Sequence, residues 1–240
     1  MIFELLKDTT TLALIVASLY FALRLYVRRR RPDWAGPLAR RRLAVLLLLV
    51  LAVITIKVTE DVLGGESGPV DNLILAFIHA HVPPESIRFF ELITLSGSFS
   101  VLLPLTSVAT LALLVARRRL EALLLASSVL AGALVVYVIK MAVGRVRPAL
   151  WVTDAYWGFS FPSGHTLVVA ALATAAVLIV DRIWPAAHRP ALLLALAWTL
   201  LVGISRMVIG VHWPTDVLAA TCIGAFLPLA MGIALKRVRS

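Results

Sequence analysis

The sequence predicts an all-α, polytopic membrane bundle, with a core of six helices and one further helix at the N-terminus. Of the 240 residues, 61% are hydrophobic and only 15% are charged. A soluble domain of this size is nearer half apolar, with about a quarter of its residues charged. Seven apolar stretches contain no charged residue, and Lys and Arg gather between these stretches. A lipid-facing surface would produce this pattern.

A helix needs roughly 20 mostly apolar residues to cross the hydrocarbon core of a bilayer. Several of the stretches are a little shorter, but flanking Lys and Arg side chains can reach the interface and extend them. The first stretch extends over 9–27, where a signal peptide is the alternative. That alternative fits poorly, because the positive charge follows the apolar run and no small-residue cleavage site is evident. The seven stretches are 9–23, 43–56, 92–116, 122–139, 166–180, 190–205 and 217–235.

Most of the 23 Lys and Arg residues fall in segments that share one side if the spans alternate. The positive-inside rule places that side in the cytoplasm and the opposite side outside the cell (inner) membrane, facing the periplasm. A net charge of +10 could suggest nucleic acid, but the arginines flank apolar spans, so no nucleic-acid partner is expected. The cytoplasmic segments are 24–42, 116–119, 181–190 and 235–240. The basic residues of the outward side are Lys7, Lys57, Arg88, Lys140, Arg145, Arg147 and Arg206.

The chain divides into an N-terminal part with its basic loop (1–42), one membrane domain (43–235) and a basic tail (236–240). No internal repeat or low-complexity domain interrupts it. Cys222 is the only cysteine and lies within an apolar run, which leaves no disulfide framework and no cysteine-based metal site.

The longest outward segment, 58–91, is mildly amphipathic and is broken at Pro83 and Pro84. It predicts short helices that lie along the outer membrane surface. Such helices could shape a lateral entrance for a lipid, or could simply connect two spans. Farther along the outward face, the aromatic residues of 151–161 would anchor a loop at the interface.

The segment VIKMAVGRVRPAL (138–150) places cations at the outward end of a span. Lys140 ends an uncharged run, and Arg147 follows seven positions later, directly before Pro148. Taken alone, these could be interfacial basic residues that contact lipid headgroups.

The segment FPSGHTLVV (161–169) opens the next span. Ser163 is expected to be the helix N-cap, its hydroxyl accepting a hydrogen bond from a backbone N–H of the first turn. Gly164 leaves the backbone open to close approach, and the first N–H groups of the helix form an anion site. His165 stands beside that site. A half-hydrated histidine at the interface is the alternative.

The segment GISRMVIGVHWPTDVLAA (203–220) contains Arg206 near the outer edge of the lipid core, where a cation is expensive unless it is paired. Pro214 suits the first position of the final helix, so Asp216 falls in its first turn. The Asp216 carboxylate can reach one nitrogen of His212, fix the tautomer and turn the other nitrogen toward a cavity. A helix-start Asp with an unrelated His is the alternative.

The predicted topology brings the three segments to one face. Three cations without carboxylate partners would repel one another unless they surround a polyanion such as phosphate, which Arg binds through two parallel hydrogen bonds. His212 could attack phosphorus while His165 protonates the leaving oxygen. No metal or other cofactor is expected, because Asp154 and Asp216 are the only carboxylates near these motifs and hard cations need several oxygen ligands.

These residues resemble, in order and spacing, the three signature motifs of the type 2 phosphatidic acid phosphatases. This lipid phosphate phosphatase superfamily also includes soluble vanadium haloperoxidases. The likeness extends from the motifs to the flanking helices, over about 43–235, and VDNLILAFIHAH…ELITLSGS is similar to the region before the second span in bacterial members. The motifs are Lys140 with Arg147-Pro148, then Pro162-Ser163-Gly164-His165, then Ser205-Arg206 with His212 and Asp216.

The resemblance implies a six-helix core and a metal-independent phosphatase. It implies acid catalysis by His165, nucleophilic attack by His212 and support from Asp216. The additional N-terminal segment departs from the family pattern: seven spans would put the N-terminus outside, and six would put it inside. The resemblance assigns phosphate binding to Lys140, Arg147, Ser163, Gly164 and Arg206.

A site at headgroup depth suits a lipid phosphate that stays in the bilayer. Undecaprenyl pyrophosphate or another polyprenyl pyrophosphate, phosphatidylglycerol phosphate and phosphatidate all fit, and the named residues do not separate them. A lipid phosphotransferase could use the same phosphohistidine, and a non-enzymatic anion or lipid carrier could use the same cations without a nucleophile. A haloperoxidase fits poorly, because it would need vanadate and those family members are soluble. The sequence leaves the oligomeric state open.

Overall fold

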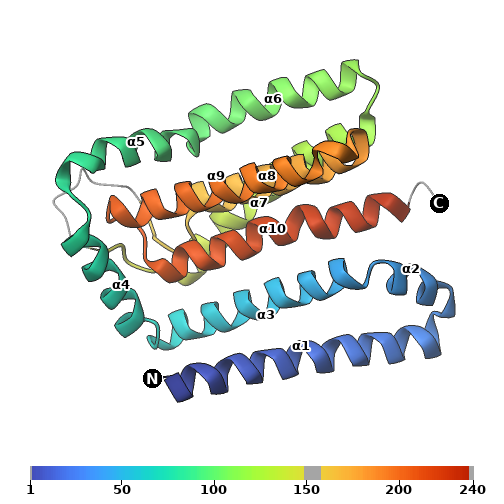
Figure 1. Ribbon diagram of the computed structural model, residues 1–240, viewed down its shortest axis with the longest axis horizontal. Helices are drawn as coiled ribbons and strands as arrows, with labels where there is room; N and C mark the ends of the chain where they lie inside the picture. Colours follow the sequence, from blue (N-terminus) through green and yellow to red (C-terminus); the bar gives the residue numbers. More distant parts are fainter. Residues whose placement is uncertain (1, 149–157, 238–240) are drawn as a thin grey trace. The chain divides into compact units, whose positions relative to one another are not determined.

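The computed structural model describes residues 2–148 and 158–237, and every regular element in these ranges is a helix (Figure 1). The all-α prediction is confirmed. Within the described residues, seven helical segments are long and apolar enough to cross a membrane, and the chain is a multi-pass membrane protein. The helices are α1 (Ile2–Arg30), α2 (Ala35–Arg40), α3 (Arg42–Gly64), α4 (Gly68–His81), α5 (Ile87–Ser96), α6 (Phe99–Val115), α7 (Arg119–Val143), α8 (Gly164–Ile183), α9 (His188–Val208) and α10 (Pro214–Arg237), with short 3-10 helices η1 (Pro32–Trp34), η2 (Pro84–Ser86) and η3 (Pro185–Ala187).

The first of two compact units ends at Lys57 and holds α1, η1, α2 and most of α3. The apolar part of α1, Thr9–Arg30, has the length and hydropathy of a span, as predicted for 9–27. Pro32 begins η1 directly after α1, at a point where proline cannot continue the preceding helix. The boundary between the units lies inside α3, whereas the predicted membrane domain begins at 43.

The second unit, from Val58 onward, is built around α8, which packs against α7, α9 and α10. Lipid is as apolar as these side chains, so helices in a membrane associate through close fit and small residues. Gly224 of α10 provides such a contact. A Cβ at this position would meet the Leu167 carbonyl oxygen and would lie 2.7 Å from the Ala170 Cβ. The close approach of α8 and α10 therefore requires glycine at 224.

The segment between α3 and α6, which is predicted to lie on the outward side, is a series of short helices. The helical structure is interrupted after α4, where Val82 is extended and Pro83 precedes η2. It is interrupted a second time between α5 and α6, inside the apolar run 92–116, where Gly97 ends α5. A Cβ on Gly97 would lie 3.0 Å from Val202 and 3.2 Å from Val169. The second break therefore lies against α8 and α9.

Backbone hydrogen bonds join the loop after α7 to the starts of α8 and α10. Gly144 ends α7 in the left-handed conformation, with φ of 65°. The Ser160 N–H donates to the Arg145 carbonyl at 2.8 Å, and the Ser163 N–H donates to the Asp216 carbonyl at 3.2 Å. These bonds bring the three predicted motifs to one end of the bundle. Asp154, most of the aromatic segment 151–161 and the last three residues of the tail lie outside the described residues.

The packing of α8 on α10 predicts that Gly224→Ala destabilises the protein. The added methyl group meets backbone, which cannot rotate away, so we expect a cost of about 1–3 kcal/mol and a lower unfolding temperature in detergent. Gly36→Ala is the matched control, because no atom lies within 4 Å of its Cβ position. An unfolding temperature for Gly224→Ala equal to that of the wild type would contradict this account of the α8–α10 contact.

Candidate active site

Two of the predicted cations are held by backbone carbonyls of the neighbouring loops. Lys140, in the last turn of α7, donates from Nζ to the Phe159 carbonyl at 2.7 Å. Arg147 donates from Nε to the Gly158 carbonyl at 3.0 Å and from Nη1 to the Val211 carbonyl at 2.8 Å. Carbonyls of the loop before α8 therefore orient both cations, and a carbonyl of the loop before α10 also orients Arg147.

His212 and Asp216 form the predicted pair at the start of α10. Nδ1 of His212 lies 3.4 Å from Oδ2 of Asp216, and the Trp213 backbone N–H donates to the same oxygen at 2.9 Å. Both side chains are buried. The carboxylate favours the tautomer with the proton on Nδ1, which leaves the lone pair on Nε2. Nε2 faces Nη1 of Arg147 at 3.3 Å, so this nitrogen lies beside a side chain that is predicted to bind phosphate.

Arg206 lies in the last turn of α9 and is 1% exposed. Its Nη1 donates to the Thr94 hydroxyl of α5 at 2.8 Å. A guanidinium buried within a membrane bundle needs such acceptors, because its desolvation is costly. No sequence motif marks Thr94, whose contact with Arg206 joins residues 112 positions apart.

Ser163 lies at the N-cap position of α8, but its predicted hydrogen bond was wrong. Its hydroxyl makes no bond to a first-turn N–H and instead pairs with the Thr166 hydroxyl at 3.0 Å. Ser163 is fully buried, and the Thr166 hydroxyl, three residues further along the chain, satisfies its hydroxyl there. Gly164 begins α8, and a Cβ on it would lie 3.3 Å from Val136 of α7.

His165 follows in the first turn of α8 and is partly exposed. It lies within electrostatic range of His212, Lys140, Arg147 and Arg206. The two imidazoles and the three cations, predicted from separate segments, therefore share one cluster.

The pKa of His212 lies well below its usual value of 6.5. Burial is the main cause, followed by the positive charges of Arg206, Arg147 and Lys140. The nearby Asp216, whose carboxylate also pairs with Arg145, does not reverse the shift. His212 is therefore neutral at physiological pH, as a nucleophile must be.

Arg145 is one of the basic residues predicted on the outward side, and the sequence motifs assign it no role. Its guanidinium bridges two buried carboxylates, Asp216 at 2.7 Å and Asp71 of α4 at 2.6 Å. It also lies over the Trp213 ring, 5.3 Å from the ring centroid. Asp71 is 74 positions away in the sequence, and the amphipathic pattern of 58–91 gives no sign of this contact.

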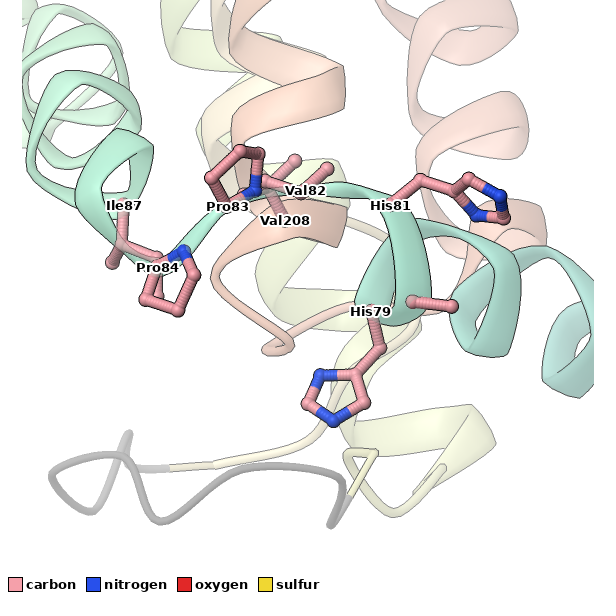
Figure 2. Close-up of a pocket in the computed structure, with 8 residues that line it drawn as sticks. His79, His81, Val82, Pro83, Pro84, Ile87 and Val208 are labelled. Carbon is pink, nitrogen blue, oxygen red and sulfur yellow. The ribbon is translucent and has the colours of Figure 1, made fainter.

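A cavity of about 370 Å³ lies at the break between α4 and α5 (Figure 2). The volume is within the usual range for small-molecule pockets. None of the predicted site residues lines it, although Val208 belongs to the same helical turn as Arg206. In the close-up, His79 and His81 point in different directions. The lining residues are His79, Ala80, His81, Val82, Pro83, Pro84, Ile87 and Val208.

Residues 2–148 and 158–237 contain no group of three or more His, Cys, Asp or Glu side chains that could hold a metal ion. Asp216, which pairs with His212, and Asp71 both accept hydrogen bonds from Arg145. A metal-free reaction remains a prediction.

The fold and this cluster define a multi-pass helical membrane protein with a cationic site that contains two histidines. A model described as the PAP2 superfamily matches residues 121–238. The chain is 32% identical to phosphatidylglycerophosphatase B of Bacillus subtilis (strain 168) over 138 residues, which cover 56% of this chain and 68% of that protein. The chain belongs to the PAP2 superfamily.

Two further similarities agree with this family. Over 66 residues the chain is 41% identical to phosphatidylglycerophosphatase B of Escherichia coli (strain K12), and the match spans 28% of this chain and 25% of that relative. The crystal structure of a transmembrane PAP2 type phosphatidylglycerolphosphate phosphatase from Bacillus subtilis superposes with a TM-score of 0.71. That match covers 80% of this chain and 95% of the other, at 24% identity, and supports the fold.

The low pKa of His212 predicts that stability falls with acidification. Below pH 6.5 the unfolded chain binds a proton on this histidine that the folded chain does not, so folding is disfavoured as the pH falls. Between pH 7 and 5.5, we expect His212 to account for a loss of about 1 kcal/mol. Thermal unfolding of wild type and His212→Asn at pH 7 and at pH 5.5 measures this loss. The variant should lose less stability than the wild type between the two pH values.

His81→Asn is the control, since it removes an exposed histidine. It should lose as much stability as the wild type between pH 7 and 5.5. Equal losses of stability in wild type and His212→Asn would rule out this protonation effect.

Proposed function

We propose that the protein is a membrane phosphatase that removes the terminal phosphate from a lipid phosphate or pyrophosphate through a phosphohistidine on His212. The observation that supports this most directly is the arrangement around His212. Asp216 faces Nδ1, Arg147 faces Nε2, and the burial and cations around the ring keep it neutral. Such a ring has an available lone pair next to a group that binds phosphate oxygens.

In the first step, the Nε2 lone pair of His212 attacks phosphorus, the P–N bond forms, and the bond from phosphorus to the leaving oxygen breaks. His165 gives its proton to the leaving oxygen. The bound phosphate compensates the positive charges around His165 and so favours its protonated form beforehand. Asp216 stabilises the positive charge that the His212 ring acquires.

In the second step, water attacks phosphorus, gives a proton to His165, and the P–N bond breaks to return neutral His212. Charge develops on the phosphoryl oxygens in both steps. Lys140, Arg147 and Arg206, with the backbone N–H groups of the first turn of α8 from Gly164 onward, neutralise it, whereas the Ser163 N–H is bonded to the Asp216 carbonyl. Preorganised donors suit this role because they need not reorganise during the reaction.

A phospholipid or polyprenyl pyrophosphate is the proposed substrate, because the site lies at the ends of membrane helices. The relatives named phosphatidylglycerophosphatase B make phosphatidylglycerol phosphate the first candidate. Undecaprenyl pyrophosphate and phosphatidate present the same terminal phosphate. The distribution of basic residues supports a location in the cell (inner) membrane with the site on the periplasmic side.

This function predicts phosphate release from a panel of phosphatidylglycerol phosphate, undecaprenyl pyrophosphate and phosphatidate, undiminished by excess chelator. His212→Ala should lower the rate by roughly three orders of magnitude or more, because the nucleophile is lost. His188→Ala is the matched control: it removes a histidine from the opposite end of α9 and should leave the rate unchanged. Phosphate release is measured with and without an acceptor lipid.

Three outcomes would contradict parts of the proposal. Loss of activity in chelator would overturn the metal-free mechanism. Transfer to the acceptor lipid in place of phosphate release would make the protein a phosphotransferase. Phosphate binding without turnover of any of the three lipids would favour a carrier.

A further inference from the structure

We propose that Asp71 and Arg145 are positioning residues for the reaction, and that they set the charge and orientation of Asp216 and, through it, of His212. This inference rests on the proposed function. Their hydrogen bonds lead to Asp216 and to Thr215 beside it, so both would act through Asp216.

The contacts form a continuous chain from α4 to the catalytic histidine. Nη2 of Arg145 donates to Oδ2 of Asp71 at 2.6 Å and to the Ser67 hydroxyl at 3.0 Å. Nη1 of Arg145 donates to Oδ1 of Asp216 at 2.7 Å. The other oxygen of Asp216 is the one that faces His212. One guanidinium therefore holds both carboxylates in place.

Thr215 closes this network at the start of α10. Its backbone N–H donates to Oδ1 of Asp71 at 3.0 Å, and its hydroxyl donates to Oδ2 of Asp71 at 2.7 Å. Nη1 of Arg145 donates to the same hydroxyl at 2.8 Å. Asp71 therefore fixes the first turn of α10, the turn that contains Asp216.

Charge gives the network a role beyond packing. Asp71 and Asp216 are both 0% exposed, and Arg145 is the cation between them, so the three groups carry a net charge of −1. His212 gains a positive charge when it carries a phosphoryl group, and this net negative charge stabilises it. Without the Asp71 charge, Arg145 would neutralise Asp216 alone. The His212 ring would then lose the negative charge that supports it.

The test compares Asp71→Asn and Arg145→Lys with wild type in purified full-length protein. For Asp71→Asn we expect kcat to fall about tenfold to a hundredfold, the range seen when the partners of metal-bound histidines are removed, with KM changed less than threefold. Arg145→Lys keeps the positive charge but loses the planar guanidinium that bonds both carboxylates, so kcat should fall less than in Arg145→Gln. Glu85→Gln and Arg88→Lys are matched controls on exposed residues of the same outward segment.

A double-mutant cycle separates positioning from packing. In an Asp216→Asn background, Asp71→Asn should lower kcat no further, because its effect passes through Asp216. The proposal would be overturned if the kcat losses of Asp71→Asn and Asp216→Asn multiplied in the double variant. It would also be overturned if Asp71→Asn lowered the unfolding temperature while its kcat per folded molecule equalled that of the wild type.

A spectroscopic readout needs no turnover. The chain has five histidines, so the ring nitrogens of His212 can be assigned in histidine-labelled protein by comparison with His212→Gln. We expect one tautomer, protonated at Nδ1, in wild type and a mixture in Asp71→Asn. The same tautomer in both proteins would contradict the inference. A shifted tautomer in a protein that releases no phosphate would contradict the proposed function and leave the positioning role standing.

Discussion

The proposed chemistry depends on the carboxylate of Asp216, which the fold holds fully buried in the first turn of α10. One oxygen faces His212 and accepts the Trp213 backbone N–H, and the other accepts a hydrogen bond from Arg145. A buried carboxylate is tolerated only when such donors surround it. The same donors leave it one orientation, and that orientation selects the nitrogen of His212 that remains free to react.

The cations of the site are placed by a different rule. Lys140 and Arg147 bond to backbone carbonyls of the surrounding loops, and Arg206 bonds to Thr94. Carbonyl and hydroxyl oxygens of this kind hold a cation in position through hydrogen bonds. By contrast, Arg145 forms ion pairs with two buried carboxylates. The site therefore contains cations oriented by carbonyl and hydroxyl oxygens and one cation that bridges two carboxylates.

Much of this architecture can be predicted from the sequence, because span length and charge placement follow directly from the bilayer. The pair of His212 and Asp216 could be predicted because it depends on four-residue spacing at a helix start. Arg145 could not be separated from Arg147 by local sequence, since its partner Asp71 comes from α4, across a long stretch of chain. The predicted N-cap bond of the Ser163 hydroxyl is absent, because N-cap preference does not take the competing Thr166 hydroxyl into account. Local rules found the residues of each motif, and tertiary contacts determined their partners.

The central claim, that His212 carries the phosphoryl group, is tested most directly by isolating that intermediate. A nitrophenyl phosphate ester needs no protonation of its leaving group, so the His165→Ala variant should complete the first step and stall before hydrolysis. Mass spectrometry of the quenched protein should then find about one phosphoryl group per chain, acid-labile and attached to His212. A burst of nitrophenol with no phosphoryl group on His212, or with the group on another residue, would contradict the account.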